Sequence, residues 1–264
     1  MQIKNILITG AGSGIGRETA IALAKKGHRV IATTHKLSQA HELKDWCEKN
    51  NISLEAFQLD VTIPKDREKI LTYDLDVLIN NAGMGESGSL AEIPVDKIRN
   101  NFEVNVFSPI ALSQLCLKHM MKKDKGSILF IGSLAGRVAM PFLGSYSMTK
   151  FALAGGIDSF RQEMRKITKN VHVSIIEPGA YHTGFNQKNV AKKFEWMNEQ
   201  SYFYKISEKI KREEQLAFKI LEHKSLQSIV KKIVKASEAK NPAFRYSAPF
   251  WQAAGVYLLR VFGK

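Results

Sequence analysis

Short apolar runs alternate with helix-patterned segments along most of this 264-residue chain, and this alternation is the strongest constraint on its fold. The apolar runs are rich in Ile, Val and Leu, which is typical of strands buried on both faces of a parallel sheet. The pattern predicts an α/β fold, a doubly wound parallel sheet of about seven strands with helices on both faces. The predicted strands are Lys4–Thr9, His28–Thr34, Ile52–Asp60, Asp76–Asn80, Ser127–Gly132, Val171–Glu177 and Phe244–Ser247.

The predicted helices fill the segments between these strands and continue after the sixth strand. They are Gly14–Lys26, Ser38–Asn50, a short stretch around Lys65–Leu71, Val95–Lys122 with a break near Asn101–Phe102, Tyr146–Thr168, one or two helices within 186–222, Ser225–Ala239 and Pro249–Phe262. No linker, internal repeat or low-complexity tract interrupts the chain. We therefore expect residues 1–264 to form a single domain.

Composition narrows the range of functions. The two cysteines, Cys47 and Cys116, are too few for a disulfide framework and suit a reducing compartment, with no metal site expected. We see no secretory signal and no long uncharged apolar run, so we expect a cytoplasmic protein. The net charge of +14 is interleaved with acidic residues, for example 13 Lys/Arg against 7 Asp/Glu over residues 186–240. This is typical of solvated helix faces, and we expect no specific nucleic-acid partner.

A glycine-rich turn follows the first predicted strand, in the run Thr9-Gly-Ala-Gly-Ser-Gly-Ile-Gly16. Missing side chains let such a backbone approach a pyrophosphate, and the first N–H groups of the next helix stabilise its negative charge. Further turn residues follow other strands, at the edge of the sheet where a dinucleotide would lie. The expected cofactor-binding residues are Gly10, Ser13, Gly14, Ile15, Gly16, Asp60, Val61, Asn81, Ala82, Gly83, Pro178, Gly179 and Thr183.

The end of the second strand bears on the type of dinucleotide. An NAD site favours a carboxylate there, whereas a 2′-phosphate favours cations. This chain carries His35 and Lys36 at that point, which favours NADP(H) over NAD(H). A plain surface His-Lys pair opening a loop is the alternative.

Tyr146 and Lys150 lie four residues apart, one helical turn, and Ser133 lies thirteen residues before Tyr146. A phenol beside a cation ionises more easily, and such a phenol can exchange a proton with a carbonyl or alcohol oxygen near neutral pH. A single Tyr-x-x-x-Lys can arise by chance, but this is the only such spacing in the chain. The combination with the glycine-rich turn indicates a nicotinamide-dependent oxidoreductase.

The glycine-rich turn, Asn80-Asn-Ala-Gly83, Ser133, Tyr146-x-x-x-Lys150 and Pro178-Gly179 occur here in the order typical of the short-chain dehydrogenase/reductase family, which the chain resembles. Three stretches, 80–90, 143–153 and 176–185, look most like the hydroxysteroid and retinol dehydrogenase subgroup. The resemblance implies a single Rossmann-type domain and a homodimer or homotetramer, with helices near 103–122 and 146–168 pairing. Only nineteen residues separate Asp60 from Asn80, fewer than is usual in the family, so we expect the intervening helix to be trimmed. Many NADP-linked members carry a basic residue where this chain has Ser13, which weakens the NADP(H) interpretation.

The same resemblance implies residue roles. Tyr146 would be the acid/base, and Lys150 would bind the nicotinamide ribose and lower the pKa of the tyrosine. Both would contact the cofactor. Ser133 would hydrogen-bond the substrate oxygen, and Asn105 would support a water-linked proton relay to Lys150. Separately from these roles, Gly155 and Gly156 lie within a predicted helix, where glycine is less favourable than alanine. We therefore expect another element to pack closely against them.

The subgroup implies an apolar alcohol or ketone as the small-molecule substrate. We expect residues 184–225 to form a helical lid over it, with aromatic side chains at Phe194, Trp196, Tyr202, Phe203, Tyr204 and Phe218; the same aromatics equally suit an ordinary buried helix face. Candidate pocket residues are Met140, Phe142, Tyr181 and Phe185. The alternatives are a 3-oxoacyl-carrier-protein reductase and a non-catalytic NADP-binding redox sensor. We expect the C-terminal helix to pack on its own domain or a partner subunit, with peripheral membrane contact as the other possibility.

Overall fold

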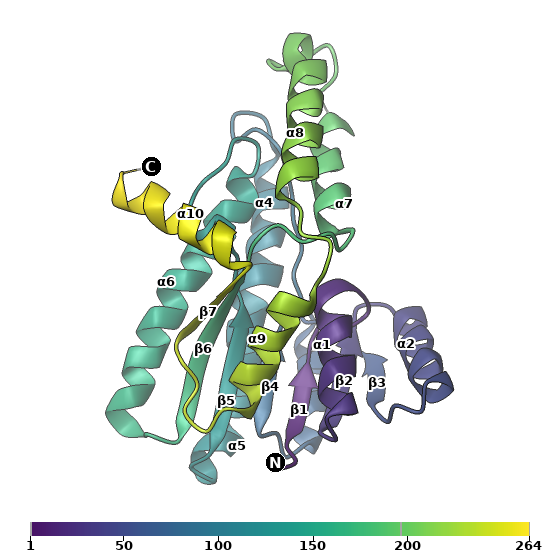
Figure 1. The fold of residues 1–264 in the computed structure, drawn as a ribbon, viewed down its shortest axis with the longest axis vertical. Coiled ribbons are helices and arrows are strands. Elements are labelled where there is room, and N and C mark those ends of the chain that lie inside the picture. Colours follow the sequence, from purple (N-terminus) through teal and green to yellow (C-terminus); the bar gives the residue numbers. More distant parts are fainter. Residues whose placement is uncertain (1, 196, 264) are drawn as a thin grey trace.

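Seven parallel strands form one sheet in the computed structural model, which describes residues 2–195 and 197–263 (Figure 1). The spatial order is β3-β2-β1-β4-β5-β6-β7, so β1 pairs with both β2 and β4 and the chain changes direction of winding there. This confirms the predicted doubly wound sheet. The strands are β1 (Asn5–Ile8), β2 (Arg29–Thr34), β3 (Glu55–Gln58), β4 (Val77–Asn80), β5 (Gly126–Ile131), β6 (Val171–Pro178) and β7 (Arg245–Ala248).

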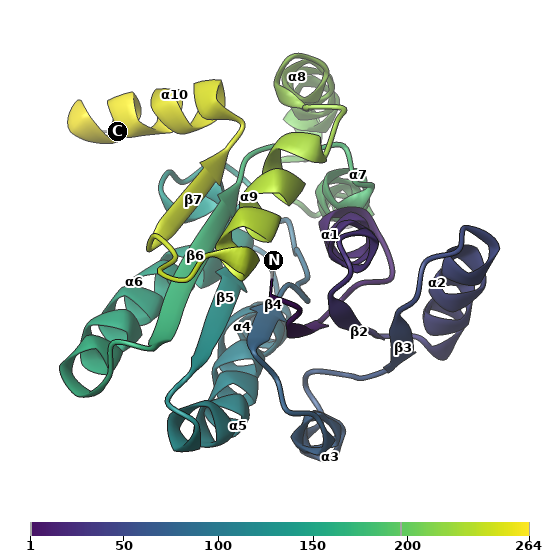
Figure 2. The same cartoon turned by 60° about the horizontal axis from the view of Figure 1, so that its bottom comes forward.

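Helices cover both faces of the sheet (Figure 2). One face packs against α1 (Gly14–Lys25), α2 (Leu37–Lys49) and α9 (Gln227–Glu238), and the other against α5 (Ser108–Lys122) and α6 (Gly144–Ile167). Central strands supply fully buried side chains to both layers. Ile6 and Ile8 of β1 face one layer and Leu7 faces the other, as expected from the alternation of side chains along a strand.

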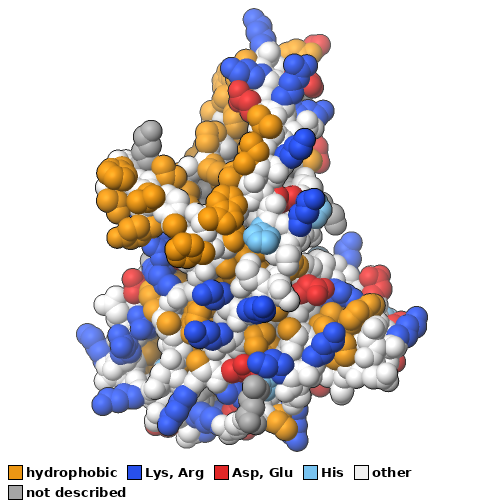
Figure 3. Space-filling view, viewed as in Figure 1, with side chains coloured by type: hydrophobic (Ala, Val, Ile, Leu, Met, Phe, Trp, Pro, Cys, Tyr) orange, Lys and Arg blue, Asp and Glu red, His pale blue; other side chains and the backbone are white. Residues whose placement is uncertain are grey.

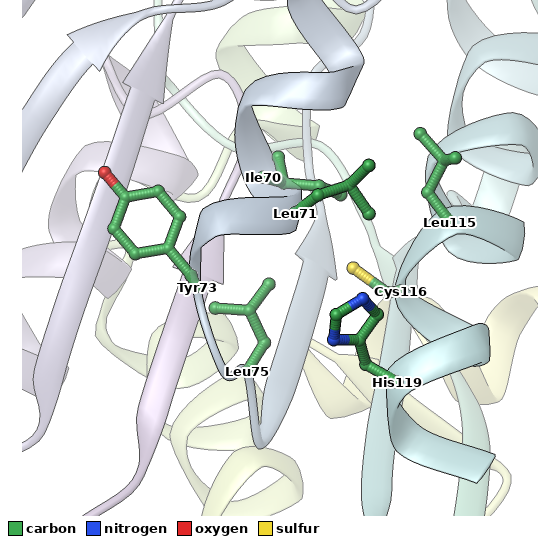
Figure 4. Close-up of a pocket in the computed structure, with 7 residues that line it drawn as sticks. All are labelled: Ile70, Leu71, Tyr73, Leu75, Leu115, Cys116 and His119. Carbon is green, nitrogen blue, oxygen red and sulfur yellow. The ribbon is translucent and has the colours of Figure 1, made fainter. Parts of the chain in front are cut away.

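The connection between β3 and β4 is short, as expected from the sequence. It consists of α3 (Pro64–Glu68) and the 3-10 helix Lys69–Thr72, which buries Ile70 against α5 but leaves Leu71 exposed. A small hollow remains between this connection and α5, with Cys116 and His119 on its α5 side (Figure 4). The trimmed connection therefore covers this face incompletely.

The predicted break near Asn101–Phe102 corresponds to a change of helix type. The α-helix α4 (Val95–Phe102) gives way to a π-helical segment, Glu103–Phe107, before α5 continues. Segments of this kind are frequently found at functional sites. Asn105 lies in the π-helical segment.

Residues 185–221 rise above the sheet as α7 (Phe185–Ala191), the 3-10 helices Lys192–Glu195 and Tyr204–Ile206, and α8 (Ser207–Leu221) (Figure 1). This agrees with the prediction of one or two helices there; Trp196, one of the predicted aromatics, lies outside the described residues. We call residues 185–221 the upper helical segment.

The last helix, α10 (Phe250–Val261), projects from the end of β7. None of its side chains is fully buried, and Gln252 joins the helix to its own domain through the Ala180 N–H and the Leu221 carbonyl oxygen. Packing of this helix on a partner subunit stays a prediction. In the described part of the chain, no helix is both long and apolar enough to cross a bilayer. The expected close packing on Gly155 and Gly156 is also missing within the chain, because a Cβ built at either position meets no atom within 4 Å.

Candidate active site

The carboxyl ends of β1, β4, β5 and β6 bring the predicted motifs to one edge of the sheet. The glycine-rich turn follows β1, Asn81-Ala-Gly83 follows β4, Ser133 follows β5, and Gly179 follows β6. This edge lies at the point where strand order reverses between β1 and β4, which is where open α/β sheets bind ligands.

The glycine-rich turn is shaped for close backbone approach. Gly10 and Gly14 have φ angles of +65° and +57°, in the left-handed region that favours glycine. A Cβ at Gly10 would lie 2.7 Å from the Ala82 Cα, and one at Gly16 would lie 2.5 Å from the Gly10 carbonyl oxygen. These two positions therefore exclude any side chain.

The N-terminus of α1 is uncapped, because the side chain of Ser13 at the N-cap makes no capping hydrogen bond and the first turn contains no acidic residue. The first-turn N–H groups and the positive end of the helix dipole are thus available to an anion. Together with the glycine cradle, this donor set fits the pyrophosphate of a dinucleotide. Ile15 and Gly16 continue the first turn of α1 beneath it.

Thr9 and Asn81 fasten the turn to the loop after β4. The Asn81 side-chain amide donates to the carbonyl oxygens of Thr9, at 2.8 Å, and Gly10, at 3.0 Å. In return, the Thr9 hydroxyl accepts the backbone N–H groups of Asn81 and Ala82, each at 3.0 Å. Sequence reasoning missed Thr9; its polar side chain at the end of an apolar strand was the available signal.

Asn105 connects three elements rather than pointing into solvent. Its amide nitrogen donates to the Met84 carbonyl oxygen at 2.8 Å and to the Thr149 hydroxyl at 3.0 Å, while its amide oxygen accepts the Met84 N–H at 2.9 Å. Gly83 lies directly against it, because a Cβ there would be 3.3 Å from the Asn105 amide oxygen. These contacts join the π-helical segment to α6 and to the loop after β4.

Ser133, Tyr146 and Lys150 converge as predicted. The Ser133 side chain lies close enough to the Tyr146 phenol to lower its pKa, and the Lys150 ammonium lies 5.6 Å from the centre of the Tyr146 ring. Lys150 is only 6% exposed and donates to the Ile131 carbonyl oxygen at 2.8 Å. Ser133 also accepts the Ala135 N–H at 3.0 Å, which fixes the serine at the end of β5.

Burial dominates the electrostatics of this cluster. It raises the pKa of Tyr146 to about 12, against the opposing effect of the Ser133 hydrogen bond, and lowers the pKa of Lys150 to about 8. Burial therefore outweighs any effect of Lys150 on the phenol, and the expected lowering of the tyrosine pKa by Lys150 stays a prediction. At neutral pH the phenol is protonated and able to donate.

His35 and Lys36, the residues expected to determine whether NADP(H) or NAD(H) binds, differ in their ion pairing. The His35 imidazole lies 3.3 Å from an Asp60 carboxylate oxygen, and Asp60 also accepts hydrogen bonds from the backbone and hydroxyl of Thr62. His35 and Thr62 both help to lower the pKa of Asp60, against its burial. The exposed Lys36 side chain forms no ion pair in the described part of the chain. Val61 is buried in the core beside Asp60.

The loop after β6 folds back against the glycine-rich turn. A Cβ at Gly14 would lie 3.1 Å from the Thr183 side chain, which places Thr183 beside the start of α1. Gly179 follows Pro178 and donates its N–H to Ala248, and a Cβ there would lie 1.9 Å from the Gln252 side-chain oxygen. Gln252 was not foreseen, because no motif links the last helix to this loop.

The candidate pocket residues divide into two groups. The Phe185 ring lies 5.9 Å from the Tyr146 ring, and Phe142 contacts Phe203 edge-on at 5.1 Å. Met140, two residues before Phe142, is exposed to solvent. Tyr181, in contrast, is buried in the core, and its hydroxyl forms a hydrogen bond with the Ser228 hydroxyl at 2.7 Å. The proposal that Tyr181 lines a substrate pocket is therefore wrong, because its side chain is committed to α9.

Comparisons with known proteins agree with this geometry. The chain is 35% identical over 179 residues to a probable short-chain type dehydrogenase/reductase, VdlC, of Helicobacter pylori, covering 66% of this chain and 63% of that protein. It is 32% identical to a 3-ketodihydrosphingosine reductase of Bacteroides thetaiotaomicron (72% of this chain, 69% of that protein). It is 33% identical to human retinol dehydrogenase 8 (71% and 62%). The alignments thus span about two thirds of the length of these relatives.

Solved structures extend the likeness over the whole sheet. A short-chain dehydrogenase from Streptomyces avermitilis superposes with a TM-score of 0.80 at 25% identity, over 99% of this chain and 93% of that one. A 7α-hydroxysteroid dehydrogenase complexed with NADH and 7-oxo glycochenodeoxycholic acid superposes with a TM-score of 0.74 at 26% identity, over 93% and 92%. The sequence profile described as short chain dehydrogenase matches residues 4–193. The chain therefore belongs to the short-chain dehydrogenase/reductase family of NAD(P)-dependent oxidoreductases, with hydroxysteroid and retinol dehydrogenases among its relatives.

Proposed function

We propose that this protein is an NADP(H)-dependent oxidoreductase that transfers hydride between nicotinamide and the carbonyl or secondary alcohol of an apolar small molecule, with Tyr146 as acid/base. The observation that carries the proposal is the convergence of Ser133 and Lys150 on the Tyr146 phenol, beside an uncapped helix N-terminus. A bound reduced nicotinamide would supply the hydride at this edge of the sheet.

In reduction, Ser133 donates a hydrogen bond to the carbonyl oxygen and stabilises the negative charge that develops on it. The protonated Tyr146 phenol then transfers its proton to that oxygen. Lys150 keeps a positive charge close to the resulting phenolate. It would also supply the proton that restores the Tyr146 phenol. We propose that Asn105 holds the loop after β4 so that a water-linked relay to Lys150 can form. In oxidation, the same groups act in reverse.

The proposal of NADP(H) rests on Lys36, whose exposed ammonium lies at the end of β2 without an ion-pair partner in the described residues, whereas His35 is paired with Asp60. Competing titrations with NADPH and NADH followed by fluorescence test it. Lys36→Ala should weaken NADPH binding about tenfold, the scale of one lost charge-assisted contact, and leave NADH binding unchanged. A clear preference of the unaltered protein for NADH contradicts the proposal.

An apolar substrate is supported by the aromatic side chains around Tyr146. Phe185 packs against the tyrosine ring, and the Phe142–Phe203 pair joins the loop before α6 to the upper helical segment. We propose that residues 184–225 act as the lid of this site. The names of two relatives, a 3-ketodihydrosphingosine reductase and a retinol dehydrogenase, are consistent with a bulky apolar carbonyl or alcohol.

We also propose a homodimer or homotetramer through the face that carries the π-helical segment and α6. Phe107, Met148 and Phe151 are large apolar side chains left exposed on these elements. Light scattering after size-exclusion chromatography tests this proposal, and Phe151→Asp should lower the measured mass. A monomeric unaltered protein contradicts it.

A panel of apolar ketones and alcohols, followed by the absorbance of the reduced nicotinamide, tests the main proposal. Tyr146→Phe should lower turnover by about a hundredfold or more while leaving cofactor binding and folding intact, because only the proton donor is lost. Acyl-carrier thioesters belong in the same panel, because turnover of these alone would indicate a 3-oxoacyl-carrier-protein reductase. Unchanged function in Tyr146→Phe would indicate a non-catalytic sensor and contradict the proposal.

A further inference from the structure

The helix α10 presents an unusually apolar face to solvent. Phe250 is 85% exposed, Tyr257 69% and Phe262, directly after the helix, 79%. Four more large apolar side chains on the helix are exposed: Trp251, Leu258, Leu259 and Val261. The inward side carries the smaller Ala253 and Ala254, so the helix directs its larger apolar groups outward.

A second apolar strip lies on α8, where Leu216, Ile220 and Leu221 are exposed. Figure 3 shows hydrophobic side chains gathered on α10 and on the side of α8 that faces it. The two helices are joined at their bases, because the Gln252 amide donates to the Leu221 carbonyl oxygen at 2.7 Å. We call these exposed apolar groups of α8 and α10 the apolar surface.

The last part of the sequence carries charge of one sign, although Arg245 within it is ion-paired with Glu177. Residues 239–264 contain four Lys or Arg and no Asp or Glu, in a chain whose net charge is +14. Two copies joined through this surface would bring like charges together, whereas an anionic lipid surface complements them. Exposed Trp and Tyr side chains among aliphatic ones are also typical of helices that lie in the headgroup region of a bilayer.

We propose that the apolar surface binds the face of an anionic phospholipid bilayer, with α10 lying in the headgroup region as the main anchor. The apolar side chains enter the acyl boundary while Arg260 reaches the headgroup phosphates, in the manner of an interfacial amphipathic helix. The α8 strip adds a second contact from a different element. This proposal does not depend on the reaction that the protein catalyses.

Flotation with vesicles tests the proposal, using phosphatidylcholine alone and phosphatidylcholine mixed with phosphatidylglycerol. The full chain should float with the mixed vesicles, bind the neutral ones more weakly, and lose affinity as salt is raised. The affinity of the double variant Leu258→Asp/Phe262→Asp for the mixed vesicles should be lower by at least about tenfold, since apolar burial supplies most of the affinity. The matched control is Ile3→Asp/Ile167→Asp, which alters two apolar side chains of 62% and 67% exposure far from α10 and should bind normally.

Trp251 supplies an independent readout. Its fluorescence should shift to shorter wavelength with mixed vesicles, and Trp251→Phe should remove that shift. No flotation with mixed vesicles, equal binding by the double variant, or equal loss in the control overturns the proposal. One further outcome also overturns the proposal. If light scattering shows that Leu258→Asp/Phe262→Asp converts an oligomer to monomers while vesicle binding is unchanged, the apolar surface is occupied by a second copy of this chain.

Discussion

The glycine-rich turn and the upper helical segment border the same site but are held in place by different kinds of contact. The turn is fixed through its backbone, by the Thr9 and Asn81 hydrogen bonds and by glycines that leave no room for a Cβ. The upper helical segment is attached through side chains, such as Lys192 to the Gly85 carbonyl oxygen at 3.1 Å and Ser201 to Glu92 at 2.9 Å. Backbone fixation leaves one geometry, whereas side-chain attachment permits opening.

The largest expected effect comes from disturbing the backbone-fixed region. Gly10→Ala forces a side chain into a left-handed conformation and into contact with Ala82, and should lower the free energy of unfolding by about 3 kcal/mol. Cofactor affinity should fall at least about tenfold, because the turn must shift. Chemical denaturation and fluorescence titration measure the two quantities.

The matched control is Gly155→Ala, on an exposed stretch of α6 where a Cβ meets nothing within 4 Å. It should raise the free energy of unfolding by about 0.5–1 kcal/mol, because alanine favours the helix. If Gly10→Ala is as harmless as Gly155→Ala, the turn is not the rigid element described above.

The same difference explains what the sequence could predict. Strand order at the glycine-rich turn, the convergence of Ser133, Tyr146 and Lys150, and the trimmed β3–β4 connection all follow from local patterns whose geometry has few solutions. The pKa of Tyr146 did not follow, because spacing reports the nearby amine but not the burial that outweighs it. Tyr181 and Gln252 depend on contacts between segments 47 and 72 residues apart, which no local pattern encodes.

The Ser133–Tyr146–Lys150 cluster, close to the glycine-rich turn, and the upper helical segment each hold a buried lysine in a different way, and this predicts a pH dependence. Lys150 has a carbonyl oxygen as partner, and burial lowers its pKa to about 8. It therefore loses its charge as pH rises through about 8, and kcat/KM for carbonyl reduction should fall by about tenfold per pH unit above that value. The free energy of unfolding changes in the opposite direction. The unfolded chain binds the Lys150 proton more tightly than the folded chain does, so burying the charged amine lowers the free energy of unfolding most below pH 8. This loss of stability is recovered as pH rises above 8.

Rate profiles of the unaltered protein and of Lys150→Arg measure this dependence. Arginine stays protonated, so the residual activity of the variant should not fall above pH 8. A fall with the same midpoint in both proteins would assign the titration to another group.

In the upper helical segment, Lys193 is fully buried and paired with the Glu214 carboxylate, beside the Phe142 and Phe194 rings. Burial lowers the pKa of Lys193 and raises that of Glu214, so both groups depend on the pairing to stay charged. Lys193→Met leaves a carboxylate without a partner and should weaken the closed segment by about 1–2 kcal/mol, seen as roughly tenfold faster proteolysis there. The double variant Lys193→Met/Glu214→Leu should restore most of the resistance. Equal loss of global stability in place of local cleavage would show that the segment does not open by itself.

The smallest expected effect concerns Gln252, where the two kinds of attachment meet. Its side-chain oxygen accepts the Ala180 N–H at 2.7 Å, beside the backbone-fixed loop, and its amide donates to Leu221 at 2.7 Å, at the end of α8. Gln252→Ala removes both bonds and should raise KM for a bulky ketone a few-fold, since each is worth about 1 kcal/mol, with little change in NADPH affinity. Gln252→Glu keeps the acceptor and loses the donor. If Gln252→Glu raises KM as much as Gln252→Ala does, the hydrogen bond to Leu221 sets the position of α8. If Gln252→Glu behaves as the unaltered protein does, only the loop after β6 needs this side chain, and other contacts control the opening of α8.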